Sequence, residues 1–257
     1  MKTDGKAGFV KSRIWDTLFT KLKQAYKRQG IGYILKTGSK MAIELPKNGF
    51  LVWYYRKFMS SRTFTFQGKK YHYLIHPYCS SWKNERAVVI PIMKEILDRY
   101  ESEKKCILEV GNTLSYIYPV SYDILDKYEI VDGVINEDVV DFNPSKKYDL
   151  IFSVVSMQHI GWDEIPREPT KIIRALKNLN RLLTSGGQLI VGLGWGYNPE
   201  IDKLLKDGSL YFDKQYYLKR ISGLEWEEVP FEEIENTTYD VSVPTSTGIA
   251  ICLSKKK

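Results

Sequence analysis

The sequence has few cysteines and no long apolar run, and each lack excludes a class of protein. Its three cysteines, Cys79, Cys106 and Cys252, are scattered through 257 residues without a C-x-x-C pair or metal-ligand spacing. A disulfide framework and a metal centre are therefore not predicted. Nowhere do about 18 apolar residues run together, and the N-terminus lacks the apolar core of a signal peptide. The sequence predicts a cytoplasmic protein that neither spans a membrane nor is exported by that route.

Negative charge is scarce in the first part of the chain. Residues 1–70 hold 16 Lys and Arg against 3 Asp and Glu, whereas residues 71–257 hold 22 against 28. Such a basic front suggests an anionic partner, either a membrane surface or a phosphate-bearing molecule. Residues 11–29 have the pattern of a basic amphipathic helix, which can lie in a bilayer interface or pack on the rest of the protein. We therefore divide the chain into a basic extension, 1–80, and a main domain, 81–257.

The main domain contains four short apolar runs that resemble strands buried on both faces. They cover residues 106–112, 122–126, 134–141 and 148–153. Continuous apolar runs, rather than alternation, are typical of a parallel sheet covered by helices. Ligands of such sheets bind beyond the carboxyl ends of the strands. Gly111, Asp126, Asp138 and Ser153 are expected there.

Turn and capping signals predict further elements around this stretch. They are a hairpin over residues 63–75 that turns at Gln67-Gly68-Lys69; an exposed polar stretch over 82–86; a helix starting near Pro91; a helix around 172–183 ended by Gly186-Gly187; a strand over 188–193 and a glycine loop over 192–196 lining a substrate cleft; a helix begun by Asn198-Pro199 and ended by Gly208; and short strands over 226–229 and 249–254.

The polar residues at the strand ends fit a nucleoside ligand. Gly111 allows a sharp turn and close approach of the backbone. Asp126, 17 residues after Glu109, is placed to bind two ribose hydroxyls, and Asp138 to accept a hydrogen bond from an adenine amino group. For each acid, a helix cap or a solvated loop is the alternative. G-x-G-x-x-G and G-x-x-x-x-G-K-[ST] are both absent, which counts against NAD, FAD and P-loop nucleotides. A ligand with a ribose and no phosphate fits best, and S-adenosylmethionine is the common one.

Several motifs resemble those of the class I S-adenosylmethionine-dependent methyltransferases, and more narrowly of the group associated with surface-polysaccharide and lipopolysaccharide biosynthesis. They are Leu108-Glu109-Val110-Gly111-Asn112, Asp126-Lys127-Tyr128-Glu129, residues 133–142, Tyr148-Asp149-Leu150-Ile151, residues 159–164 and Pro166-Arg167-Glu168-Pro169. The resemblance covers residues 80–253. It implies an α/β fold with a Rossmann-like, seven-stranded, mostly parallel sheet, helices on both faces, and an antiparallel last strand over residues 249–254.

The same resemblance implies roles for individual residues. Glu109, Gly111 and Asn112 would flank the methionine part of the cofactor, Asp126 the ribose, and Asp138 with Val139 the adenine. The family's first motif has two or three glycines, whereas the later positions here are Thr113 and Ser115. A relative that binds the cofactor without catalysis therefore remains an alternative.

The acceptor is predicted less directly. An alcohol acceptor needs a base for its proton, and histidine is the commonest base. His159 follows the strand over 148–153 by a few residues, with Asp163 nearby; a packed histidine at a helix start is the alternative. Asn143-Pro144 precedes that strand, whereas methyltransferases of DNA adenine and protein glutamine carry such a pair after it, which disfavours amide and base N-methylation.

Three hypotheses follow. The first is O-methylation of a sugar of a lipid-linked or polymeric glycan, at the inner face of a membrane that residues 1–70 touch. The second is a non-catalytic adaptor docking through its basic front. The third is an RNA methyltransferase that uses the front as a phosphate-binding surface, although nucleic acid is not the expected partner.

Overall fold

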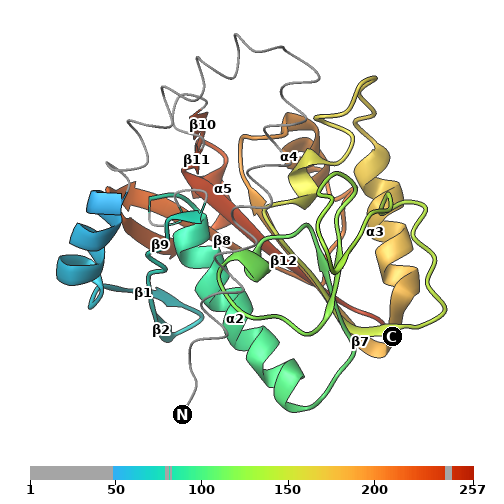
Figure 1. Ribbon diagram of the computed structural model, residues 1–257. Coiled ribbons are helices and arrows are strands. Elements are labelled where there is room, and N and C mark those ends of the chain that lie inside the picture. Colours follow the sequence, from blue (N-terminus) through green and yellow to red (C-terminus); the bar gives the residue numbers. More distant parts are fainter. Residues whose placement is uncertain (1–48, 79–80, 82, 241–244) are drawn as a thin grey trace, which may run out of the picture.

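A central sheet organises the protein (Figure 1), which we describe from a computed structural model for residues 49–78, 81, 83–240 and 245–257. The sheet has eight strands in the order β5-β4-β3-β6-β7-β12-β8-β9. They are β3 (Ile107–Val110), β4 (Asp123–Leu125), β5 (Val134–Ile135), β6 (Tyr148–Val154), β7 (Leu183–Gly194), β8 (Lys214–Ser222), β9 (Glu225–Val229) and β12 (Gly248–Lys255). The first five in this order are parallel, and β12 is antiparallel to both of its neighbours.

The predicted fold class is confirmed, with one strand more than expected. The mostly parallel sheet and the antiparallel β12 correspond to the prediction, and the short strand predicted over 226–229 is present as β9, which pairs with β8 at the edge of the sheet. β8 was not predicted. Its sequence, KQYYLKRIS, mixes charged residues with half-buried tyrosines, and such a run carries a weak strand signal.

Two helices cover opposite faces of the sheet. Helix α2 (Arg86–Ser102) packs with Phe152 and Ile190 in one hydrophobic cluster, whereas helix α3 (Lys171–Leu182) packs with Ile151 and Leu189 in another. Neighbouring residues of a strand point to opposite faces, so the two clusters lie on either side of β6 and β7. This arrangement buries the strands on both faces and leaves their carboxyl ends accessible at one edge.

The start of α2 corrects two predictions. The helix begins at Arg86, so Pro91 lies inside it rather than at its first position. The stretch over 82–86, predicted to be exposed, contains Asn84 and Glu85, which are each only 3% exposed. Glu85 is buried because its Oε2 accepts hydrogen bonds from Ser246 N and Thr245 Oγ1, both at 3.2 Å. These partners lie about 160 positions away in sequence, so local pattern gave no sign of them.

The predicted glycine loop over 192–196 is also corrected, since β7 continues to Gly194. A Cβ on Gly192 would come within 2.8 Å of Val89 Cγ1, so this glycine lets α2 approach the sheet. The preceding helix α3 ends at Leu182, and Gly186-Gly187, predicted to stop it, lie inside β7. Close packing thus explains Gly192, whereas Gly186 is suited to its position by a φ of +76°, in the left-handed region.

The hairpin predicted over residues 63–75 is present but shorter, as strands β1 (Thr63–Phe66) and β2 (Lys69–His72), and Lys69 belongs to β2 and not to the turn. Gln67 and Gly68 both have positive φ, as a two-residue hairpin turn requires. Phe64 and Phe66 join the cluster under α2, so the hairpin shares a core with the sheet. The division of the chain at residue 80 stays a prediction.

The other elements are short. They are the 3₁₀ helices η2 (Leu114–Tyr116) and η3 (Met157–His159), helices α4 (Pro199–Lys206) and α5 (Phe231–Ile234), and the strand pair β10 (Tyr239–Asp240) and β11 (Thr245–Ser246). Helix α4 starts after Asn198, whose side chain caps it, as predicted. Cys252 is buried, and Cys106 is partly exposed.

The amphipathic helix predicted over residues 11–29 lies outside the described residues. Residues 49–59 are helical, with Phe50 63% and Trp53 52% exposed. Within the described part of the chain, no helix is both long enough and apolar enough to cross a bilayer. Membrane contact through residues 1–70 stays a prediction.

Candidate functional site

A cavity of about 410 Å³ opens at the carboxyl ends of β3, β4 and β5 and beyond the end of β6. The structure brings six of the nine predicted site residues into its lining: Gly111, Asp126, Asp138, Val139, His159 and Asp163. The expectation that strand ends converge on one site is met, because parallel strands end at the same edge of a sheet.

Gly111 forms the turn directly after β3. Its φ is +89°, in the left-handed region, and its N–H donates to the carbonyl of Leu125 at 2.8 Å. A Cβ at this position would collide with Oγ of Ser156, in the loop after β6. The absence of a side chain therefore lets two loops meet at the cavity wall.

Gly111→Ala is expected to lower the free energy of unfolding by about 2–3 kcal/mol, because an alanine here combines an unfavourable φ with a collision. Urea denaturation measures this loss. The double substitution Gly111→Ala with Ser156→Gly removes the collision and should recover part of the stability. An unchanged midpoint for the single variant would mean that the two loops are not held together.

Asp126 follows β4 and shapes the next loop. Its Oδ1 accepts hydrogen bonds from Tyr128 N and Glu129 N, both at 2.9 Å. Its Oδ2 has no partner among the described residues, and the side chain lines the cavity. The carboxylate is thus fixed by one oxygen and can accept hydroxyl donors with the other.

Asp138 lies three residues beyond the end of β5, which is only Val134–Ile135 and not the longer strand predicted over 134–141. The backbone turns after Ile135, and Asp138 O accepts from Asp141 N at 3.0 Å. Val139 beside it is 6% exposed and supplies an apolar part of the wall.

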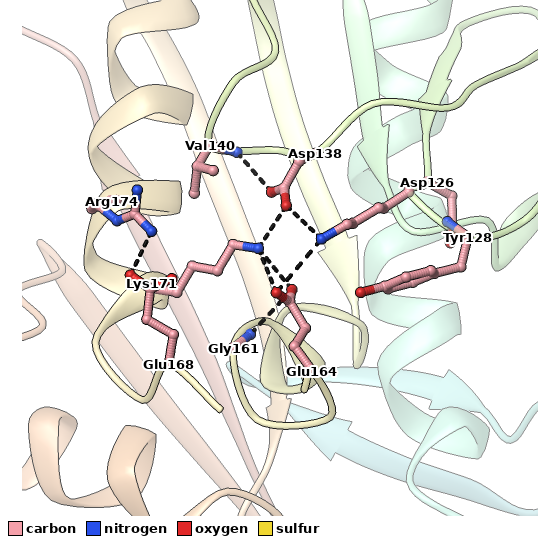
Figure 2. A network of polar contacts seen from close by, with 10 residues as sticks. Asp126, Tyr128, Asp138, Val140, Gly161, Glu164, Glu168, Lys171 and Arg174 are labelled. Atoms are coloured by element: carbon pink, nitrogen blue, oxygen red, sulfur yellow. Dashed lines mark hydrogen bonds and ion pairs between the residues drawn. The ribbon is translucent and has the colours of Figure 1, made fainter. Parts of the chain in front are cut away.

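Two lysines hold the Asp138 carboxylate. Its Oδ2 lies 2.6 Å from Nζ of Lys171, and Oδ1 accepts from Val140 N at 3.2 Å (Figure 2). Nζ of Lys127 lies 2.7 Å from the same Oδ2. Lys171 also contacts both carboxylate oxygens of Glu164, at 2.6 and 2.8 Å. Burial tends to raise the pKa of Asp138, but the lysines outweigh it and lower the pKa to about 2. Asp138 is therefore an ionised acceptor at neutral pH.

Sequence reasoning missed Lys127, Lys171 and Glu164 as members of this site. One signal was present in the sequence of α3. Lys171 is the first residue of that helix, where the helix dipole disfavours a positive charge. A carboxylate partner compensates for this, and Lys171 has two, in the partly buried Asp138 and Glu164.

His159 is held at the cavity edge by Asp163 and Tyr197. Nδ1 of His159 lies 2.6 Å from Oδ2 of Asp163, and the hydroxyl of Tyr197 donates to the same oxygen at 2.6 Å. The two rings meet edge to face, with centroids 4.6 Å apart. Because a carboxylate only accepts, neutral His159 carries its proton on Nδ1 and keeps a lone pair on Nε2. Burial and Asp163 raise the pKa of Tyr197, so it stays a donor.

Three predicted residues, Glu109, Asn112 and Ser153, lie outside the cavity lining. Glu109 is fully buried and accepts from Thr113 N at 2.8 Å and from Leu114 N at 2.9 Å. Burial raises its pKa to about 7. Ser153 donates to the carbonyl of Val110 at 2.8 Å, so it joins two strands instead of facing a ligand. Glu109 and Ser153 thus hold the strand β3 and the loop after it, and neither lines the cavity.

Thr113 and Ser115, which stand where the family's first motif has glycines, stabilise the loop after β3. Thr113 donates its N–H to Glu109, and the Ser115 hydroxyl donates to Asn112 Oδ1. Both residues are buried. The loop is therefore closed by side-chain hydrogen bonds.

Comparison with known proteins gives matches among solved structures alone. No family model and no curated protein matches the sequence. An amino pentose methyltransferase of Micromonospora echinaspora, CalS10, is 16% identical, covering 41% of this chain and 50% of its own, with a TM-score of 0.30. The N-methyltransferase NodS of Bradyrhizobium japonicum, in complex with S-adenosylhomocysteine, is 12% identical, covering 67% and 91%, with a TM-score of 0.38. The sugar N-methyltransferase KedS8 of a Streptoalloteichus species is 12% identical, covering 63% and 86%, with a TM-score of 0.33.

Likenesses of this size carry no argument about the reaction. The fold is instead evident in this chain's own sheet, which is mostly parallel and has an antiparallel β12. Its cavity lies at the carboxyl ends of β3, β4 and β5. This chain has the Rossmann-like architecture expected of a class I methyltransferase.

Proposed function

We propose that the protein is an S-adenosylmethionine-dependent methyltransferase that methylates a hydroxyl group of a sugar in a surface or lipid-linked glycan. One observation carries the proposal. His159, oriented by Asp163 at 2.6 Å, lines the same cavity as Asp126 and Gly111. The cavity thus contains both a base that can take a hydroxyl proton, His159, and residues suited to binding a nucleoside.

The chemistry of the lining fits the cofactor. Asp126 offers a carboxylate oxygen to the ribose hydroxyls, and Asp138, ionised at neutral pH, offers an acceptor to the adenine amino group. Leu125, Val139 and Ile160 provide apolar surface for the flat base. When bound, S-adenosylmethionine supplies a methyl group on a positively charged sulfur.

His159 would act on the acceptor. Its Nε2 would take the proton of the acceptor hydroxyl, and Asp163, 2.6 Å from Nδ1, would stabilise the imidazolium that results. Tyr197 keeps the Asp163 carboxylate in place through its hydrogen bond of 2.6 Å. Holding donor and acceptor in line contributes much of the rate of such a displacement.

The glycan acceptor is supported by the sequence resemblance to polysaccharide-associated methyltransferases. The exposed ring of Tyr128, 63% accessible at the cavity rim, offers a surface on which a sugar can stack. The cytoplasmic face of a membrane is the proposed location, since lipid-linked sugars are built there and the front of the chain is basic.

Titration calorimetry with S-adenosylmethionine and S-adenosylhomocysteine tests the cofactor assignment. Both are expected to bind the full chain, and Asp126→Asn should weaken binding about tenfold, because the amide keeps an oxygen for Tyr128 N and Glu129 N but loses the charge. Asp141→Asn, on the same edge with an exposed side chain, is the control and should bind like the wild type. A folded protein without affinity for either ligand would refute the assignment. Binding without methyl transfer to any extracted glycan would favour the non-catalytic alternative.

A further inference from the structure

The geometry points to Lys127 as a residue that closes the adenine end of the cavity by bridging Asp138 and Glu164. An adenine amino group that binds Asp138 displaces it from this position. This inference rests on the proposed function. Asp138 already pairs with two lysines, so an adenine amino group can reach its Oδ2 only if one of them moves.

Lys127 spans the cavity between two walls. Its Nζ lies 2.7 Å from Asp138 Oδ2 and 3.5 Å from Glu164 Oε2, and all three residues line the cavity. Lys127 follows β4, Asp138 follows β5, and Glu164 belongs to the loop before α3. The ammonium group therefore occupies the position that a hydrogen-bond donor of a bound base must reach.

The ion pair between Lys127 and Asp138 is weak enough for a ligand to replace it. The Lys127 side chain is 37% exposed, and ion pairs of exposed side chains are weak and screened by salt. Lys171 contacts the same Asp138 oxygen at 2.6 Å but is only 6% exposed. When Lys127 leaves, Lys171 still compensates Asp138 and keeps it ionised. Lys171 thus keeps the Asp138 carboxylate ionised, whereas Lys127 competes with the ligand for it.

Lys127 and the ligand compete for one oxygen. An adenine amino group that donates to Oδ2 of Asp138 replaces Lys127 there, because Lys171 already contacts that oxygen at 2.6 Å. Binding of the adenosyl ligand at this oxygen therefore includes the breaking of an ion pair.

The salt dependence of S-adenosylhomocysteine binding tests this inference. The ligand has no net charge at neutral pH, so salt acts mainly on the protein's own ion pairs. Calorimetry of the wild type should show tighter binding as sodium chloride rises, because screening weakens the Lys127 bridge. Lys127→Met should bind up to about fivefold more tightly at low salt, and its affinity should be flat with salt. Lys127→Gln, neutral but polar, should behave in the same way.

Lys146→Met is the matched control. Lys146 also pairs with an aspartate of the same sheet, Asp123, at 2.6 Å and is 50% exposed, but it lies outside this cavity. This variant should keep the wild-type affinity and salt response. If wild type binds S-adenosylhomocysteine and Lys127→Met matches it at every salt concentration, the competing role is wrong while the proposed function stands. If neither binds, the proposed function itself fails.

Discussion

Replacing Lys171 by methionine is expected to lower the free energy of unfolding by about 2–3 kcal/mol, since Asp138 and Glu164, which are 16% and 17% exposed, then keep only the exposed Lys127 as a counter-ion. Asp138 and Glu164 both depend on this ammonium, at 2.6 Å each, and Lys171 is only 6% exposed. Urea denaturation at pH 7 measures the loss. Methionine keeps the length and apolar packing of the side chain, so the change is chiefly one of charge.

Lys127→Met is the matched comparison, because it removes a second ammonium from the same oxygen of Asp138. The distances are nearly equal, 2.7 and 2.6 Å, but Lys127 is 37% exposed. Its loss should cost less than about 1 kcal/mol. Equal effects of the two substitutions would show that burial does not separate the two pairs and would contradict the picture of one fixed and one exchangeable lysine.

The effect of Lys171 also depends on pH. The lysines lower the pKa of Asp138 from 3.8 to about 2, so this carboxylate contributes stability that is full well above pH 4 and is lost as the pH falls toward 2. The pKa of Glu164 is lowered as well. The difference in stability between wild type and Lys171→Met should therefore shrink in acid. A difference that is constant from pH 7 to pH 3 would exclude ion pairing as its cause.

The sequence predicted the sheet and the positions of the strand-end residues because these depend on local pattern. Apolar runs located β3, β4 and β6, and Asp126 immediately follows β4 as expected. Asp138 was placed on the correct edge even though β5 is much shorter than predicted. The loop after a strand stays near its end, so a misplaced boundary of a few residues leaves the site residue within reach.

The partners of these residues could not be predicted, because they are distant in sequence. Lys171 lies 33 positions after Asp138, and Tyr197 lies 34 after Asp163. A lysine or tyrosine in a polar loop or helix start has many possible neighbours, and only the packing of α3 and the end of β7 selects one. Glu109, in contrast, was predicted to flank the cofactor and lies outside the cavity lining. Its place in an apolar run signalled burial, which the structure shows, and the buried carboxylate serves backbone N–H groups instead of lining the cavity.

The chemical step should depend most on His159. His159→Asn is expected to lower kcat by about 10²- to 10⁴-fold, the usual contribution of a general base. The asparagine amide can still donate to Asp163, which lies 2.6 Å from Nδ1, but it has no group in the place of Nε2. Transfer of labelled methyl from S-adenosylmethionine to extracted glycans measures the rate.

A merely structural role for His159 would give a different result. The dissociation constant of S-adenosylhomocysteine should change less than about twofold in His159→Asn, because the substitution leaves Asp126 and Asp138 in place. Nitrogen chemical shifts of the wild type should show the proton on Nδ1, and Asp163→Asn should alter this tautomer by removing the acceptor. If His159→Asn keeps its turnover, or if Nε2 carries the proton in the free protein, His159 is not the base. The acceptor would then have to lose its proton to another group at the cavity.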